Sequence, residues 1–125
     1  LIPPACALLG YYPGKQLGFG DREARTLMTD CLAVAKTNRY QASGLSKDLD
    51  SGIAAYTGPV LCLRMQDDAF APRESVHAVS DKFIQAEVEH RVLNAQVLGD
   101  KADHFRWARK PEAVTQTIAT WLDNL

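Results

Sequence analysis

The sequence predicts an α/β fold in which two parallel strands are flanked by helices. A short apolar run at residues 60–63 follows the breaker Gly58–Pro59, and such a run is typical of a strand buried on both faces. Pro72 is suited to the first position of a helix. Residues 86–93, AEVEHRVL, then alternate between apolar and polar as a second strand does. A strand, a helix and a strand in this order predict a parallel pair with a right-handed crossover.

The elements before this strand–helix–strand unit are predicted from prolines and glycines, which interrupt regular structure, and from residues that cap or line a helix. Residues 1–20 are rich in proline and glycine, which predicts irregular structure. Asp21 is expected to cap a helix that runs to about Arg39. That helix carries an apolar stripe at helical spacing, made of Ala24, Leu27, Met28, Cys31, Leu32 and Ala35. Residues 41–57 are expected to form a long polar connection with one short turn of helix.

Two further helices are expected beside the strands. The first covers residues 73–83, with its buried side marked by Val76, Val79 and Phe83. A loop is expected at residues 98–103. The last helix begins at Pro111, and its inner face is expected to hold Val114, Ile118, Trp121, Leu122 and Leu125. Because a two-stranded sheet is not stable alone, the sheet is expected to continue in sequence or partners outside this chain.

The composition excludes several classes of function. The chain has 125 residues, of which 46% are hydrophobic and 23% charged, as in an ordinary globular domain. A net charge of −1 provides no field that attracts nucleic acid or an anionic membrane. No apolar run approaches the length of about 18 residues that a transmembrane helix needs, and the first residues lack the basic region of a signal peptide. We therefore expect neither nucleic acid nor membrane as a partner.

The three cysteines are Cys6, Cys31 and Cys62. They are far apart and odd in number, which fits neither a disulfide framework nor a zinc site. Each lies among apolar residues, so each is expected to be a small buried hydrophobe in a reducing compartment. This usage favours a cytoplasmic protein.

Asp68 and His104 are the candidate chemical pair. Each follows one of the predicted strands, and parallel strands place their carboxyl ends on one side, so the two side chains can meet. An aspartate that binds one imidazole nitrogen fixes the tautomer and leaves the other nitrogen as a base toward a nucleophile. The alternative is an aspartate that caps the following helix and a histidine that is hydrogen-bonded within a loop.

The neighbouring polar residues are expected to have other roles. Asp67 is expected to bind turn amides, and Cys62 lies within a strand, where packing is the favoured role. His77, His90 and His104 match no metal-ligand spacing, so neither a metal nor another cofactor is expected. A basic cluster beside His104 either favours an anionic substrate or forms a solvated face; it consists of Arg106, Arg109 and Lys110.

These stretches resemble a known superfamily. LCLRMQDDAFAPRESV at 61–76 is similar to the acid turn of the α/β-hydrolases, G-x-x-D-x-x-x-P followed by a helix. Asp68 stands at the acid position and Pro72 at the proline, whereas Met65 replaces the glycine. DHFRW at 103–107 resembles the histidine loop that precedes the last helix. LGYYPGKQLGFGDREARTLM at 9–28 resembles the cap region of a branch of bacterial predicted hydrolases.

The resemblance implies the C-terminal part of an α/β-hydrolase fold. Residues 1–57 would be the cap or lid region with its connection, and residues 58–125 a portion of the core. The implied activity is cleavage of a small-molecule ester, thioester or amide, with Asp68 orienting His104 as general base for a serine. No G-x-S-x-G occurs in the chain. The serine is therefore expected upstream, outside these residues, and the isolated chain is expected to be inactive.

Two other interpretations remain open at the level of sequence. The chain could be a non-catalytic α/β binding or interaction module that assembles, for example as a homo-oligomer, through an exposed sheet edge. A flavodoxin-like binding domain is less favoured, because no glycine-rich phosphate loop follows either strand.

Overall fold

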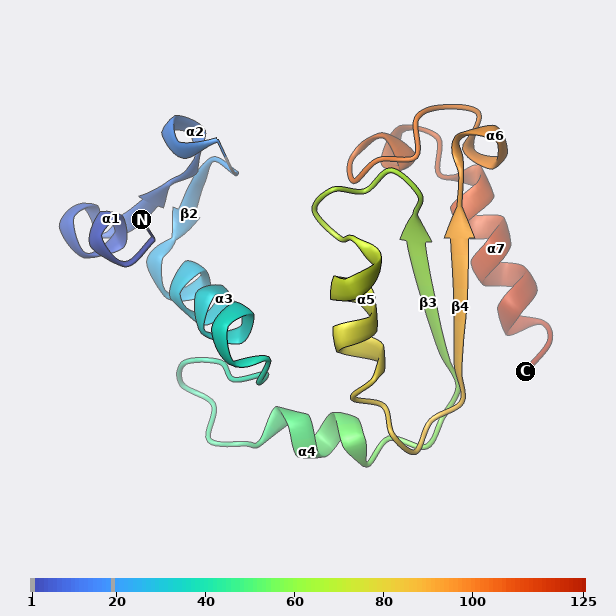
Figure 1. The fold of residues 1–125 in the computed structure, drawn as a ribbon, viewed down its shortest axis with the longest axis horizontal. Helices are drawn as coiled ribbons and strands as arrows, with labels where there is room; N and C mark the ends of the chain where they lie inside the picture. Colours follow the sequence, from blue (N-terminus) through green and yellow to red (C-terminus); the bar gives the residue numbers. More distant parts are fainter. Residues whose placement is uncertain (1, 19) are drawn as a thin grey trace. The chain divides into compact units, whose positions relative to one another are not determined.

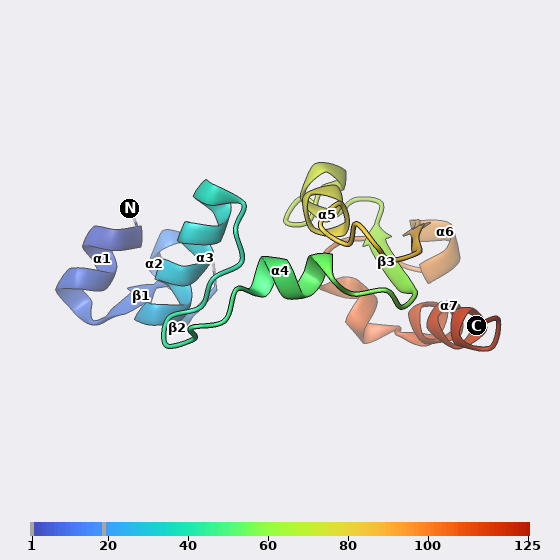
Figure 2. The same ribbon diagram turned by 90° about the horizontal axis from the view of Figure 1, so that it is seen from below.

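The computed structural model describes residues 2–18 and 20–125, and its helices and strands are shown in Figures 1 and 2. The chain divides into two compact units, residues 1–52 and 53–125. Each unit contains helices and one two-stranded sheet, so the chain is mixed α/β, as the sequence predicts. No helix in the described ranges has both the length and the apolar character needed to cross a membrane.

The first unit is built around a short antiparallel strand pair. In chain order its elements are α1 (Ile2–Leu9), β1 (Tyr11–Pro13), α2 (Gly14–Leu17), β2 (Arg22–Ala24) and α3 (Arg25–Thr37). β1 pairs with β2 so that Tyr12 lies opposite Glu23. Cys6, Tyr12 and Met28 are buried together and form the small core of this unit.

The ordered elements between residues 2 and 17 correct the expectation of an irregular start. Both prolines of α1 lie in its first turn, where the amide hydrogens that proline lacks would have no partner within the helix. Gly10 follows the helix with a φ of 74°, and its amide donates to the carbonyl of Cys6 at 3.0 Å. Proline at the start and a left-handed glycine at the end are thus compatible with a helix. The same expectation for residues 1 and 19 lies outside the described residues.

α3 begins at Arg25, later than expected. Residues 22–24 pair with β1 instead, and Ala24 occupies the N-cap position without a side-chain hydrogen bond, so Asp21 is not the cap. Of the predicted apolar stripe, Met28 is buried, whereas Leu27 and Cys31 are exposed. The predictions of a buried stripe and a buried Cys31 are therefore wrong. The elements of this unit that pack on α3 are short, and they cover only part of its face.

The second unit follows the connection at residues 41–57, in which a short helix is present as predicted. This helix is α4 (Leu49–Ala54), and the boundary between the two units falls within it, after Gly52. The later elements are β3 (Val60–Met65), α5 (Arg73–Ser80), β4 (Val88–Leu93), α6 (Ala95–Leu98), the 3₁₀ helix η1 (Arg106–Arg109) and α7 (Glu112–Leu122).

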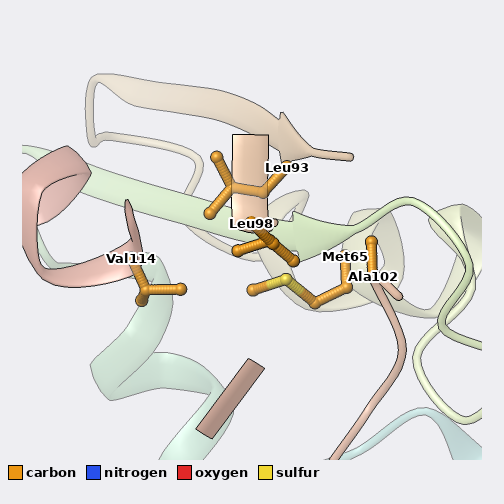
Figure 3. Close-up of a cluster of buried hydrophobic side chains, with 5 residues drawn as sticks. All are labelled: Met65, Leu93, Leu98, Ala102 and Val114. Atoms are coloured by element: carbon orange, nitrogen blue, oxygen red, sulfur yellow. The ribbon is translucent and has the colours of Figure 1, made fainter. Parts of the chain in front are cut away.

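β3 and β4 form the parallel pair that the sequence predicts (Figure 1). Cys62 lies opposite His90, and Met65 lies opposite Leu93. Figure 2 shows α5 and α7 on opposite sides of this pair. The last residues of both strands pack into the core of the unit, which contains Met65, Leu93, Leu98, Ala102 and Val114 (Figure 3). The buried core therefore lies at the carboxyl ends of the strands.

α6 was not among the predicted helices, and the loop predicted at residues 98–103 follows it, with Leu98 as the last residue of the helix. Asn94 caps this helix, since its side chain accepts a hydrogen bond from the amide of Val97 at 3.0 Å. Gly99 ends the helix in the left-handed conformation, with a φ of 65°. A capping asparagine and a C-terminal glycine five residues apart are signals of a single helical turn, and the turn places Leu98 in the core.

The strands are less buried than the sequence predicts. In β3 only Met65 is buried and the other residues are half-buried, so this strand is not covered on both faces. Val92, an apolar residue of the alternating stretch at 86–93, is exposed. The helices on the two sides are too few and too short to cover both faces of the pair.

The predicted inner faces of α5 and α7 are also partly exposed. In α5 the buried residue is Ser80, Val79 is exposed, and the helix ends before Phe83. α7 buries Val114, but three of its predicted inner residues, Ile118, Leu122 and Leu125, are exposed. Both helices carry apolar residues at helical spacing. Among the described residues of this unit, no further helix or strand covers the apolar residues that are exposed.

The location of the core predicts a contrast between two leucines of this unit. Leu98 is 5% exposed and Leu122 is 55% exposed. Leu98→Ala should lower the free energy of unfolding by about 2–5 kcal/mol, because it leaves a cavity in the core. Leu122→Ala should cost less than about 1 kcal/mol. Urea unfolding of both variants measures this difference, and equal losses would contradict the position of the core.

Candidate functional site

Asp68 lies in the turn that directly follows β3 and is buried. Its Oδ1 atom accepts hydrogen bonds from the backbone amides of Phe70 and Ala71, each at 2.9 Å. The amide of Asp68 itself donates to the carbonyl of Met65, the last residue of the strand, at 3.3 Å. One carboxylate oxygen is thus engaged in holding the turn, and the position of the other is fixed as a result.

That second oxygen, Oδ2 of Asp68, lies 2.8 Å from Nδ1 of His104. The structure thereby brings together the two side chains that the sequence selects as the candidate pair. Because an ionised carboxylate can only accept, Nδ1 of His104 donates and Nε2 presents its lone pair. The Asp68 side chain is 7% exposed and the His104 side chain 43% exposed. The acid is therefore enclosed, while the imidazole is accessible to a reactant.

The loop that carries His104 is tied to the turn that carries Asp68. The amide of Asp67 donates to the carbonyl of Ala102 at 2.8 Å, and Ala102 is completely buried in the core. On the other side of His104, its carbonyl accepts a hydrogen bond from the indole nitrogen of Trp107 at 3.0 Å. The backbone on both sides of the imidazole is therefore anchored independently of the bond to Asp68.

Asp103 organises the start of η1. Its Oδ1 atom accepts from the amides of Phe105 and Arg106 at 3.1 and 2.9 Å, a side-chain turn that ends the loop after His104. Arg106 in turn lies 3.6 Å from the carboxylates of both Asp100 and Asp103, and Lys110 donates to the carbonyl of Gly99 at 3.2 Å. Two members of the predicted basic cluster thus make local structural bonds.

Phe70, Phe105 and the imidazole of His104 form a cluster of three rings, a feature that sequence reasoning missed. The ring of His104 lies 5.4 Å from that of Phe70 and 4.9 Å from that of Phe105, and the two phenyl rings are 5.7 Å apart. Both phenylalanines are more than half exposed. One phenylalanine lies two residues after Asp68 and the other directly after His104, and this proximity in sequence could have predicted that they lie near the pair. They form an apolar rim beside the accessible imidazole.

The electrostatics of Asp68 favour its ionised form. Burial raises the pKa of the carboxyl. The hydrogen bond with His104, those from the amides of Ala71 and Phe70, and the charge of the imidazolium lower the pKa more, so that it lies below the ordinary value for aspartate. Asp68 is thus suited to hold a negative charge against the imidazole.

The adjacent carboxylate, Asp67, does not have the role expected of it. It was expected to bind turn amides, but those amides are bound by Asp68, and Asp67 is exposed. The alternative of Asp68 as the cap of α5 is not observed either, because Pro72 is the N-cap residue and no side chain caps the helix. Met65 and the backbone of Asp67 fix the turn so that only the second aspartate faces His104.

The remaining candidates do not join this pair. Cys62 is half-buried within β3, and burial raises the pKa of its thiol, which disfavours the nucleophilic thiolate. His77 and His90 stack on each other, with ring centroids 4.5 Å apart, whereas the Asp68 carboxylate contacts His104. Within the described ranges, no three His, Cys, Asp or Glu side chains are arranged to hold a metal ion.

The lowered pKa of Asp68 predicts how stability depends on pH. A depressed pKa contributes stability above the ordinary aspartate value of about 4, and this contribution is lost as the pH falls through the lower value of the folded state. The gap in unfolding free energy between wild type and Asp68→Asn should be wide at about pH 5 and should narrow below about pH 4. Urea unfolding across this range measures the gap.

Asp67→Asn is the matched control for this experiment. The Asp67 side chain is exposed and adjacent in sequence, and the bond to His104 is made by Asp68. Its stability profile should therefore run parallel to that of the wild type. A gap for Asp68→Asn that stayed constant down to about pH 2.5 would show that the carboxylate is not stabilised in its ionised form.

Comparisons with known proteins identify no relative of this chain, so a proposal about its function rests on the geometry of the site. No family model, no curated protein and no solved structure matches the chain. What the chain offers is an enclosed carboxylate, an accessible imidazole oriented by it, and an apolar rim, all at the carboxyl ends of two parallel strands.

Proposed function

We propose that this chain supplies the acid and the base of a serine α/β-hydrolase. The observation that carries the proposal is the 2.8 Å contact between Asp68 Oδ2 and His104 Nδ1. In this geometry the aspartate holds the imidazole in the tautomer whose Nε2 can remove a proton. The carboxyl ends of neighbouring parallel strands are also where open α/β sheets place their chemistry.

The proposed reaction is acyl transfer to a serine that lies outside this chain. His104 Nε2 takes the proton of the serine hydroxyl as its oxygen attacks the carbonyl carbon of an ester, thioester or amide. The resulting imidazolium is stabilised by the Asp68 carboxylate and then gives its proton to the leaving group. Water repeats the sequence, with His104 again as the base, and releases the acid and the serine.

The surroundings of His104 favour a substrate with an apolar part. Phe70 and Phe105 present exposed rings beside the imidazole and in contact with each other, and such rings bind apolar groups better than charged ones. The charge of Arg106 is offset by the carboxylates of Asp100 and Asp103. In this proposal residues 1–57 serve as the cap region and residues 58–125 as part of the core, in keeping with the resemblance of residues 9–28 and 61–76.

The decisive experiment uses the natural protein that contains these residues. A fluorophosphonate probe should label one serine outside the 125 residues, and Asp68→Asn or His104→Ala should slow this labelling by about 10³–10⁴-fold, as loss of a triad member does. Asp67→Asn should label at the rate of the parent protein. The position of the labelled serine is read by peptide mass spectrometry.

The isolated chain provides the complementary measurement. It should neither turn over a p-nitrophenyl ester efficiently nor react with the probe, because none of its serines stands in a G-x-S-x-G elbow. Efficient turnover together with labelling of one of its own serines would contradict an external nucleophile. Labelling of the natural protein that is indifferent to His104→Ala would contradict the role of His104.

A second candidate function is supported by the open sheet. Among the described residues, β3 and β4 pair only with each other, so each has one edge without a neighbouring strand. Unpaired strand edges favour pairing with another chain. In this alternative the chain is a non-catalytic module that assembles with a second copy through a strand edge.

The assembly alternative predicts concentration-dependent dimerisation. Val92→Lys, in β4, should shift the equilibrium to the monomer, because a charge on an edge strand opposes pairing. Val97→Lys is the control, since Val97 lies in α6 and is exposed to a similar extent, 55% against 50% for Val92. Light scattering after size exclusion gives the mass. A monomer at all concentrations up to about the millimolar range would reject this function.

A further inference from the structure

A hollow of about 420 Å³, with a largely apolar lining, lies in the unit of residues 53–125, and neither Asp68 nor His104 lines it. It is lined by Arg64 of β3, Arg73 and His77 of α5, and His90 of β4. No acidic residue is among the described residues that line it. Positive and titratable nitrogen groups from three elements thus converge on one space, on the face of the strand pair that α5 covers.

The two arginines are held without being neutralised by carboxylates of this hollow. Arg64 donates through Nη1 to the carbonyls of Met65 and Gln66, both at 3.3 Å. Arg73 donates through Nε to His77 Nε2 at 3.4 Å. A guanidinium carries five N–H donors, so these bonds orient each group and leave donors for a further acceptor.

The two histidines form a stack between helix and strand. Their ring centroids are 4.5 Å apart and their planes are inclined by 19°. His77 receives the bond from Arg73 on one nitrogen, and its other nitrogen lies 4.0 Å from Asp81. Both nitrogens of His77 thus have partners within the protein, so the stack adds the imidazole of His90 as an adaptable donor or acceptor beside the fixed charges.

Arg91 also lines the hollow, but its charge is directed elsewhere. Its guanidinium bonds the Glu89 carboxylate and the carbonyl of Thr117 in α7. The charges offered to a ligand are therefore those of Arg64 and Arg73, supplemented by the hydrogen-bonding nitrogens of His90. Two fixed positive charges match a dianion better than a monoanion.

We propose that this hollow binds a dianionic oxyanion, the phosphate group of a phosphate monoester. Guanidinium forks match the oxygens of a phosphate in geometry as well as charge. The side chains of Val76 and Val92 form apolar parts of the lining and provide a surface for the organic group of the ester. The proposal is independent of the hydrolase function, because no lining residue belongs to the Asp68–His104 pair.

The three histidines of the chain provide a direct test. The 125-residue chain, labelled with ¹⁵N, is titrated at constant ionic strength and about pH 8, where phosphate is mainly dianionic, with inorganic phosphate and, separately, with phenyl phosphate. The imidazole signals of His77 and His90 should shift and saturate in the millimolar range or below. Those of His104 should not move. Tighter binding of phenyl phosphate would identify an ester rather than the free ion as the ligand.

Two substitutions and one control make the test specific. Arg73→Gln and, separately, Arg64→Gln should each weaken binding about tenfold or more, because each removes a charge-assisted donor. Arg25→Gln is the matched control, since Arg25 is also the first residue of a helix but lies in the other unit, and it should bind as the wild type does. Amide spectra establish that each variant is folded.

Any of three results would overturn the proposal in whole or in part. Shifts that rise linearly and equally at all three histidines would show unspecific ionic effects only. Binding that survives in every folded arginine variant would show that the anion binds elsewhere. Stronger binding of inorganic phosphate than of phenyl phosphate would retain the anion site and reject the ester as its ligand.

Discussion

The candidate site depends on the hydrogen bonds of Asp68, whose two carboxylate oxygens bind different partners. One oxygen closes the turn through the amides of Phe70 and Ala71, and the other meets the imidazole of His104. A carboxylate that served only the imidazole would have its rotation limited by one bond. Here the two amides fix the carboxylate independently of the histidine. The orientation of His104 therefore follows from the fold of the turn.

The same turn joins the site to the core. The backbone bond from Asp67 to Ala102 links the acid turn to the histidine loop, and Ala102 packs beside Met65 and Val114. The two loops are therefore positioned by the packing of the strand ends rather than by surface contacts. This is how a small parallel pair can present two functional side chains at a defined distance although much of its surface is exposed.

Much of the second unit could be predicted from local rules. A Gly-Pro breaker, an apolar run and a proline before a helix locate the first residues of β3 and α5, whereas their ends differ from the prediction by two or three residues. Parallel pairing explains why Asp68 and His104 meet. The distance to Pro72 selects Asp68 over Asp67 through the resemblance of this stretch to the acid turn of the α/β-hydrolases. These features depend on nearest neighbours in the chain, which a sequence records directly.

The errors have one physical origin in common. β2 replaces the predicted start of α3 because residues 22–24 find a partner in β1, a pairing that no local signal reveals. Cys31, Val92 and Leu122 have apolar surroundings in sequence but are exposed, because burial depends on what else packs nearby. The aromatic rim and the His77–His90 stack likewise arise from contacts between elements, so spacing alone could not place them.

The location of the core at one end of the strand pair has a consequence for motion. Met65 and Leu93, the final residues of the strands, are buried, whereas Glu87 and Ile84, before β4, are exposed. Regions with few buried contacts open first in native-state fluctuations. Fraying should therefore begin at the amino ends of the strands and reach the carboxyl ends last. The Asp68–His104 pair would then stay assembled during partial openings that already separate the far ends of β3 and β4.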